Sequence, residues 1–188
     1  FNMMFLEEIW SRNFTNLFIA PIKISEIISA LTLTAVVRTL IGLVPATILA
    51  IPLFGVSIFK IGTPLIFLLI PLYIFGVTLG LFVASGLLRY GPSFENVAWA
   101  SLFFFAPLGC IYYPIEILPS FLQTIAKALP LVHIFEEMRN ILINGTVNHL
   151  KILLANAVSI IYFLLGVSVF YLSYYGAKKR GTLINMGE

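Results

Sequence analysis

The residues of this chain that could do chemistry are few and widely spaced. His133, His149 and the single cysteine, Cys110, have no partners at the spacing that metal ligands need. No serine, histidine and carboxylate stand in a nucleophile-elbow context, and no GxxxxGK[ST] sequence is present to hold nucleotide phosphates. The sequence therefore predicts no enzyme, no metal site and no cofactor on this chain.

Polar residues gather instead in the first 26 residues. In this segment Glu7, Glu8, Arg12, Asn13 and Asn16 alternate with large apolar residues. The pattern is typical of an amphipathic helix that lies across a membrane face. Two roles are open: an interfacial anchor, or a docking helix for a cytoplasmic partner.

Other charged residues stand alone or in small groups. Arg38 lies within an apolar stretch, where a charge costs on the order of 3 kcal/mol and faces a partner, a water-filled cavity or the headgroups. Snorkelling to the interface and a role in a transport pathway are both open for it. Arg89 and Glu95 flank a short loop, where they either are solvated, pair with each other or bind a partner. A last group is expected near the outer face: Glu116, Glu136, Glu137 and Arg139.

Four long uncharged runs must position these residues, at 39–59, 61–88, 96–115 and 152–177. A hydrocarbon core about 30 Å thick takes roughly 20 helical residues to cross, so each run is long enough. The chain is 60% hydrophobic and only 10% charged, which excludes an ordinary soluble domain. We predict an all-α membrane protein, a polytopic transmembrane helix bundle with spans at about 27–58, 62–88, 96–116 and 152–176.

A different pattern separates the third and fourth predicted spans. Pro119 and Pro130 each precede a short amphipathic stretch, about 15 Å long as a helix and therefore too short to cross. Asn144-Gly145 predicts the end of the second stretch. We expect short helices at about 119–143 that form a re-entrant or amphipathic hairpin on the extracellular side.

The charge pattern predicts the orientation. Lys178, Lys179 and Arg180 directly follow the last predicted span, and basic clusters of this kind stay in the cytoplasm. Four crossings then place both termini of this chain in the cytoplasm. Residues 1–26 become a cytoplasmic segment and residues 27–188 a transmembrane domain. The net charge of +3 is spread over scattered basic residues, which gives little support for nucleic-acid binding.

Two blocks of the sequence resemble a known family. The segment EEIWSRNFTNLFIAPI, at 7–22, resembles the coupling-helix region of type-2 ATP-binding-cassette (ABC) exporter permeases. The block 87–142 looks like the most distinctive region of that family. The resemblance rests on the ordered combination of four short motifs: Tyr113-Pro114, Leu118-Pro119, Leu129-Pro130 and the Glu-x-x-Arg formed by Glu136 and Arg139.

The resemblance implies a six-helix permease of which this chain holds helices three to six, with residues 1–6 as the end of the second span. It implies an exporter in the cell (plasma or inner) membrane, in which a second permease copy, taken as a homodimer, and cytoplasmic ATPase subunits take part. The residues expected to contact the ATPase subunit are Glu7, Glu8, Arg12, Asn13, Asn16, Arg89 and Glu95. Those expected to line or gate the pathway are Arg38, Pro45, Pro107, Tyr113, Pro114, Pro119, Pro130, Glu136 and Arg139.

Two other functional classes stay open, a non-transporting membrane scaffold and a channel or secondary carrier. The carrier is disfavoured because the four uncharged runs lack the intramembrane carboxylates that proton-coupled carriers commonly use. The substrate cannot be read from the sequence. Aromatic-rich spans suit an amphiphilic or lipid-like cargo, but phenylalanine is equally a common lipid-facing residue.

Overall fold

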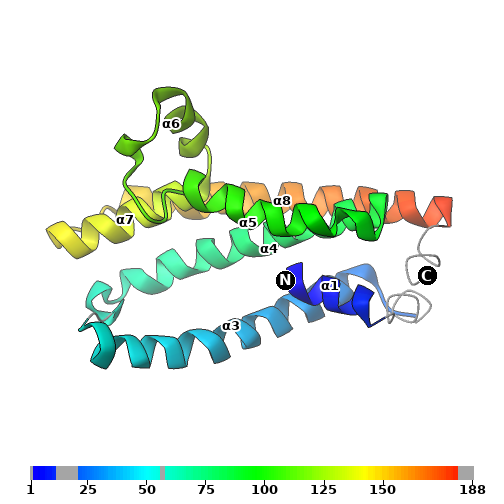
Figure 1. The fold of residues 1–188 in the computed structure, drawn as a ribbon, viewed down its shortest axis with the longest axis horizontal. Helices are drawn as coiled ribbons and strands as arrows, with labels where there is room; N and C mark the ends of the chain where they lie inside the picture. The colour runs from blue at the N-terminus through cyan, green and yellow to red at the C-terminus, as the bar shows by residue number, and fades with distance from the viewer. Residues whose placement is uncertain (1, 12–20, 56–57, 182–188) are drawn as a thin grey trace. The chain divides into compact units, whose positions relative to one another are not determined.

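A computed structural model describes residues 2–11, 21–55 and 58–181, and the described residues form helices joined by turns, without a strand (Figure 1). The predicted all-α membrane class is thereby confirmed. Three of the described helices are long and apolar enough to cross a membrane. They are α3 (Ile24–Phe54), α4 (Pro64–Tyr90) and α8 (His149–Arg180).

Shorter elements connect and cover these helices. Four of them are α-helices: α1 (Asn2–Trp10), α5 (Glu95–Leu108), α6 (Ser120–Lys127) and α7 (Pro130–Asn144). Three are single 3₁₀ turns: η1 (Ile58–Ile61), η2 (Pro92–Phe94) and η3 (Ile115–Ile117). The helices α6 and α7 lie where the sequence predicts two short helices at about 119–143.

The helix α5 ends at Leu108, whereas the predicted third span runs to residue 116. Its 14 residues measure about 21 Å at 1.5 Å per residue, which is less than the hydrocarbon thickness. Helical backbone stops here because Cys110 adopts a left-handed conformation with φ 53°. Leu108, Gly109 and Cys110 are buried, and irregular backbone at membrane depth is tolerated where protein covers it.

By spatial contact the chain divides into two compact units. Unit 1 holds the described residues of Phe1–Val56, Val77–Ala98 and Gly166–Glu188, and unit 2 those of Ser57–Gly76 and Trp99–Leu165. The helices α4, α5 and α8 each contribute residues to both units. This division by contact differs from the predicted division by membrane location at residue 26, which stays a prediction.

In unit 1, α1 packs against α3 (Figure 1). Its buried residues include Met4, Phe5 and Leu6. The Phe5 ring meets the ring of Phe170 edge to face, with centroids 6.2 Å apart. The apolar face of α1 is thus fixed within the unit.

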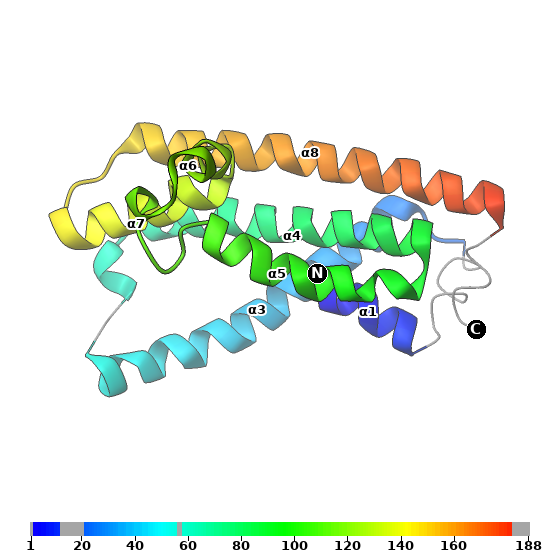
Figure 2. The same cartoon turned by 45° about the horizontal axis from the view of Figure 1, so that its top comes forward.

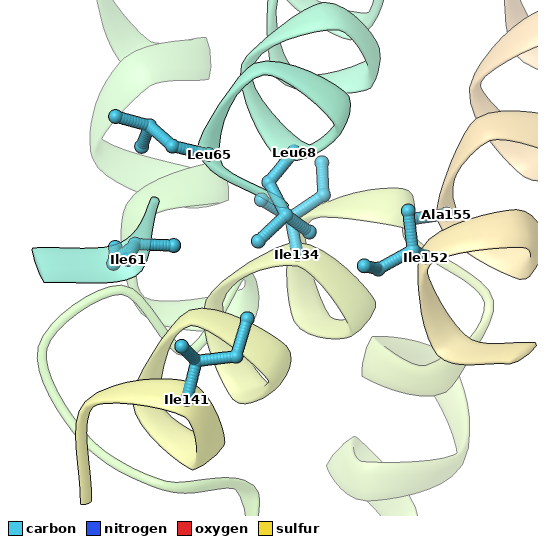
Figure 3. Packing of buried hydrophobic residues seen from close by; sticks show 7 residues of the cluster. All are labelled: Ile61, Leu65, Leu68, Ile134, Ile141, Ile152 and Ala155. Atoms are coloured by element: carbon cyan, nitrogen blue, oxygen red, sulfur yellow. The ribbon is translucent and has the colours of Figure 1, made fainter. Parts of the chain in front are cut away.

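In unit 2, seven buried apolar residues from η1, α4, α7 and α8 form one cluster, whose side chains converge in Figure 3. Three members, Leu68, Ile134 and Ala155, are fully buried. The helix α6 packs on α7 (Figure 2), and Ala126 and Val132 meet Cys110 in a second, smaller cluster. Unit 2 therefore has an apolar core of its own, with α7 at its centre.

The end of α7 follows the sequence signal. Gly145 follows the helix in a left-handed conformation, φ 66°, and its N–H donates to the Ile141 carbonyl at 3.0 Å. Glycine adopts this conformation without steric cost and commonly ends helices in this way. The predicted stop at Asn144-Gly145 is therefore correct.

Candidate functional site

The first polar contact of interest connects α1 to α3 within unit 1. Arg38 Nη1 lies 2.7 Å from both carboxylate oxygens of Glu7. The hydrogen bond from Arg38 holds the pKa of the Glu7 carboxyl below its ordinary value. Arg38 therefore has a protein partner, although the sequence left snorkelling and a pathway role open for it. The pair joins a residue predicted for ATPase contact to one predicted for the pathway.

A second polar contact connects α1 to the start of α5. Trp10 Nε1 donates to Glu95 Oε2 at 3.1 Å. Glu95 belongs to the predicted second contact with the ATPase subunit, so the structure brings this loop next to the predicted coupling segment. Arg89 does not pair with Glu95 among the described contacts. Its guanidinium instead lies over the neighbouring Tyr90 ring, 5.6 Å from the centroid.

The structure describes only some of the other predicted coupling residues. Arg12, Asn13 and Asn16 lie outside the described residues. Glu8 is described and half-buried on α1, where its backbone carbonyl accepts a hydrogen bond from the Ser11 hydroxyl at 3.2 Å.

In unit 2, the predicted Glu-x-x-Arg pair connects α7 to the loop that follows α5. Glu136 and Arg139 form an ion pair at 2.7 Å. Glu136 also accepts the backbone N–H of Ile115 at 3.1 Å, and Arg139 Nη2 donates to the Cys110 carbonyl at 3.1 Å. The two side chains thus satisfy backbone groups at both ends of the irregular segment 110–115.

The neighbouring Glu137 differs from its predicted environment. The sequence predicts it in a charged group near the outer face, but the structure buries it completely. Its Oε1 accepts the N–H of Asn148 at 2.6 Å, just before α8 begins. Its Oε2 has no hydrogen-bond partner among the described atoms. Burial of such a group is costly unless it is satisfied, so the position of Glu137 depends on its hydrogen bond to the Asn148 N–H.

The family model described as "ABC-2 type transporter" matches residues 1–143. The chain belongs to the ABC-2 type transporter family. No curated protein and no solved structure matches the chain. As a member of this family it is a membrane-embedded permease subunit of an ABC transporter.

In this ABC-2 permease, the predicted pathway residues fall into two groups. Arg38 and Pro45 lie on α3 in unit 1. The others lie in unit 2, where most of the prolines precede or begin a helix: Pro114 before η3, Pro119 before α6 and Pro130 as the first residue of α7. These positions suit proline because its φ is preset and its missing N–H is not needed there.

Pro107 and Tyr113 belong together in the same unit. The Tyr113 hydroxyl donates to the Pro107 carbonyl at 2.9 Å, which closes the turn after α5. In the ranges that the structure describes, no group of three or more His, Cys, Asp or Glu side chains could hold a metal ion.

Sequence reasoning missed two polar residues of α8. Pro71 in α4 has no N–H, which frees the Phe67 carbonyl one turn earlier. The Asn156 side chain donates to this carbonyl at 3.1 Å, and the Ser159 hydroxyl donates to the Pro71 carbonyl at 3.1 Å. A neighbouring helix thus satisfies the backbone groups at the proline. The sequence signal that could have identified them is the helical spacing of Asn156 and Ser159, three residues apart in an otherwise apolar span.

Proposed function

We propose that the chain is the permease of an ATP-driven ABC exporter that moves an amphiphilic or lipid-like substrate out of the cytoplasm. ATP is hydrolysed on a separate nucleotide-binding subunit, because the sequence has no phosphate-binding loop of its own. Two permease copies form a homodimer in the cell membrane. Both termini of this chain face the cytoplasm, in keeping with the basic cluster at the end of α8.

The observation that carries this proposal is the position of α1 between two polar contacts. Glu7 on α1 contacts Arg38 on α3, and Trp10 at the end of α1 contacts Glu95 at the start of α5. A displacement of α1 by a partner subunit would therefore reach two other helices of the unit directly. The residues after α1, which include Arg12, Asn13 and Asn16, would lie against the ATPase subunit.

The polar contacts of unit 2 suggest a complementary role. Glu136 and Arg139 hold the segment 110–115 against α7, so the α6–α7 hairpin is fixed to the end of α5. A movement of α5 would then move the hairpin, which we place at the outer exit of the pathway.

Affinity purification of the full-length protein with identification of its partners tests the proposal. A P-loop ATPase should co-purify in stoichiometric amount, and its ATP hydrolysis should rise when the permease is present in a bilayer. A scaffold or a secondary carrier would be recovered without such an ATPase, and that result would overturn the proposal. The partner's identity would also decide between homodimeric and heterodimeric permeases.

A further inference from the structure

A cleft lies between the ends of α4 and α8 in unit 1, with a volume of about 490 Å³. Its rim carries three basic residues: Arg89 from the last turn of α4, and Lys179 and Arg180 from the last turn of α8. Val169 and Leu172 on α8 supply an apolar wall. All of these residues belong to the same compact unit. None of them takes part in the two polar contacts of α1 described above.

The three cations have no acidic partner among the described residues. The nearest acidic residue in sequence to Arg89 is Glu95, and its Oε2 accepts from Trp10. The one described interaction of Arg89 is with the Tyr90 ring. The side chains of Lys179 and Arg180 are exposed, and they make no hydrogen bond or ion pair in the described part of the chain. The cleft therefore has an excess of positive charge that the described residues of the unit do not neutralise.

Helix dipoles explain only part of this arrangement. Cations stabilise helix C-termini, and each end carries a partial charge of about −0.5, so two helix ends offset roughly one of the three positive charges. The helix dipole accounts for the positive charge of these residues. It does not account for an open cleft with an apolar wall beside them.

The order of the residues along α8 matches the shape of an amphiphile. Leu172 precedes Lys179 by two turns of helix, about 10 Å at 1.5 Å per residue. The cations thus lie at the helix end, and the apolar wall lies deeper in the candidate membrane span. A free phosphate ion would contact the cations but would leave Val169 and Leu172 unused.

We propose that this cleft binds one anionic membrane phospholipid, with its phosphate at Arg89, Lys179 and Arg180 and its acyl chain along Val169 and Leu172. Basic pockets between membrane helices bind anionic headgroups by the same charge complementarity. We place this lipid in the cytoplasmic leaflet, and this placement rests on the orientation given under Proposed function. The binding itself does not depend on that orientation or on the ATPase subunit.

The test uses the full chain in nanodiscs of phosphatidylcholine with increasing phosphatidylglycerol, and native mass spectrometry to count bound lipids. R89Q/K179Q should bind phosphatidylglycerol more weakly by about fivefold for each cation removed. The matched control is K23Q/K178Q, which removes the same charge from exposed residues that do not line the cleft. The control should bind phosphatidylglycerol like the parent protein.

Two further measurements distinguish a phospholipid from a free phosphate ion as the ligand of the cleft. L172S should weaken phosphatidylglycerol binding, because it removes part of the apolar wall, and inorganic phosphate should compete poorly in the parent protein. Equal losses in R89Q/K179Q and K23Q/K178Q would show attraction by net charge alone and overturn the proposal. Effective competition by phosphate, or no effect of L172S, would show that the cleft binds a small anion and not a lipid. Either result would overturn the proposal. If the double variant does not fold, the single variants K179Q and K178Q give the same comparison.

Discussion

The two compact units use their polar side chains in opposite ways. In unit 2, Glu136, Glu137 and Arg139 on α7 all bind backbone groups of neighbouring loops, and all are buried or half-buried. In unit 1, the polar contacts of α1 join exposed or half-buried side chains, and the cations at the ends of α4 and α8 have no acidic partner among the described residues. Unit 2 thus uses its polar groups to hold its own fold. Unit 1 uses its polar groups to join α1 to α3 and α5, and it leaves the cations at the ends of α4 and α8 without an acidic partner among the described residues.

The largest loss of stability should come from a substitution of Glu137. Glu137→Ala removes the acceptor of the Asn148 N–H and leaves a cavity in a buried site, which should lower the free energy of unfolding by about 3 kcal/mol. Denaturant titration in detergent micelles measures the change. Glu137→Gln keeps an oxygen acceptor and should recover at least half of the loss. Equal stability of Glu137→Ala and the parent protein would contradict the structural role of this residue.

A smaller loss is expected at Gly109. An added Cβ would lie 2.7 Å from Leu131 Cδ1 and 2.9 Å from the Phe105 carbonyl oxygen, so helix α7 or the backbone of α5 must move. Gly109→Ala should lower the free energy of unfolding by about 1–3 kcal/mol. Gly76→Ala is the control, because no atom lies within 4 Å of its added Cβ. If both variants unfold alike, the close approach of α7 to the end of α5 is wrong.

The smallest effect on stability is expected in unit 1. Glu7→Gln weakens an exposed ion pair, so it should change the unfolding temperature only slightly. Because the folded-state pKa of Glu7 is lowered, the contribution of the pair is complete above the ordinary carboxyl pKa and disappears as the pH falls through the lowered value. Thermal unfolding of both proteins between neutral and acidic pH should therefore converge in acid. A difference that grows in acid would contradict the assigned pair.

The sequence predicted the elements that depend on local pattern. Apolar runs located the long helices, and Asn144-Gly145 located the end of α7, because hydropathy and glycine conformation act over a few residues. The contacts between distant residues were not predictable. Arg38 pairs with Glu7, which is 31 positions away in the sequence. The buried Glu137 likewise accepts the N–H of Asn148, 11 positions later.

The early end of α5 could not be predicted from the sequence for a similar reason. Nothing in the side chain of Cys110 signals a left-handed backbone, which is held in place by Arg139 and by the packing of Gly109 on α7. Of the candidate site, the sequence identified Glu7, Arg38 and Glu95 as residues of interest. It did not identify Trp10 as the partner of Glu95.

The central claim is that α1 transmits the motion of an ATPase subunit through its polar contacts. The most direct measurement is the ATP hydrolysis rate of the purified permease–ATPase complex with Trp10→Phe, which removes the N–H donor to Glu95 and keeps an aromatic ring. Trp99→Phe, at an exposed position of α5, is the matched control. We predict that Trp10→Phe lowers the stimulation of ATP hydrolysis by the permease and that Trp99→Phe does not. Equal stimulation in the two variants and the parent complex would contradict the claim.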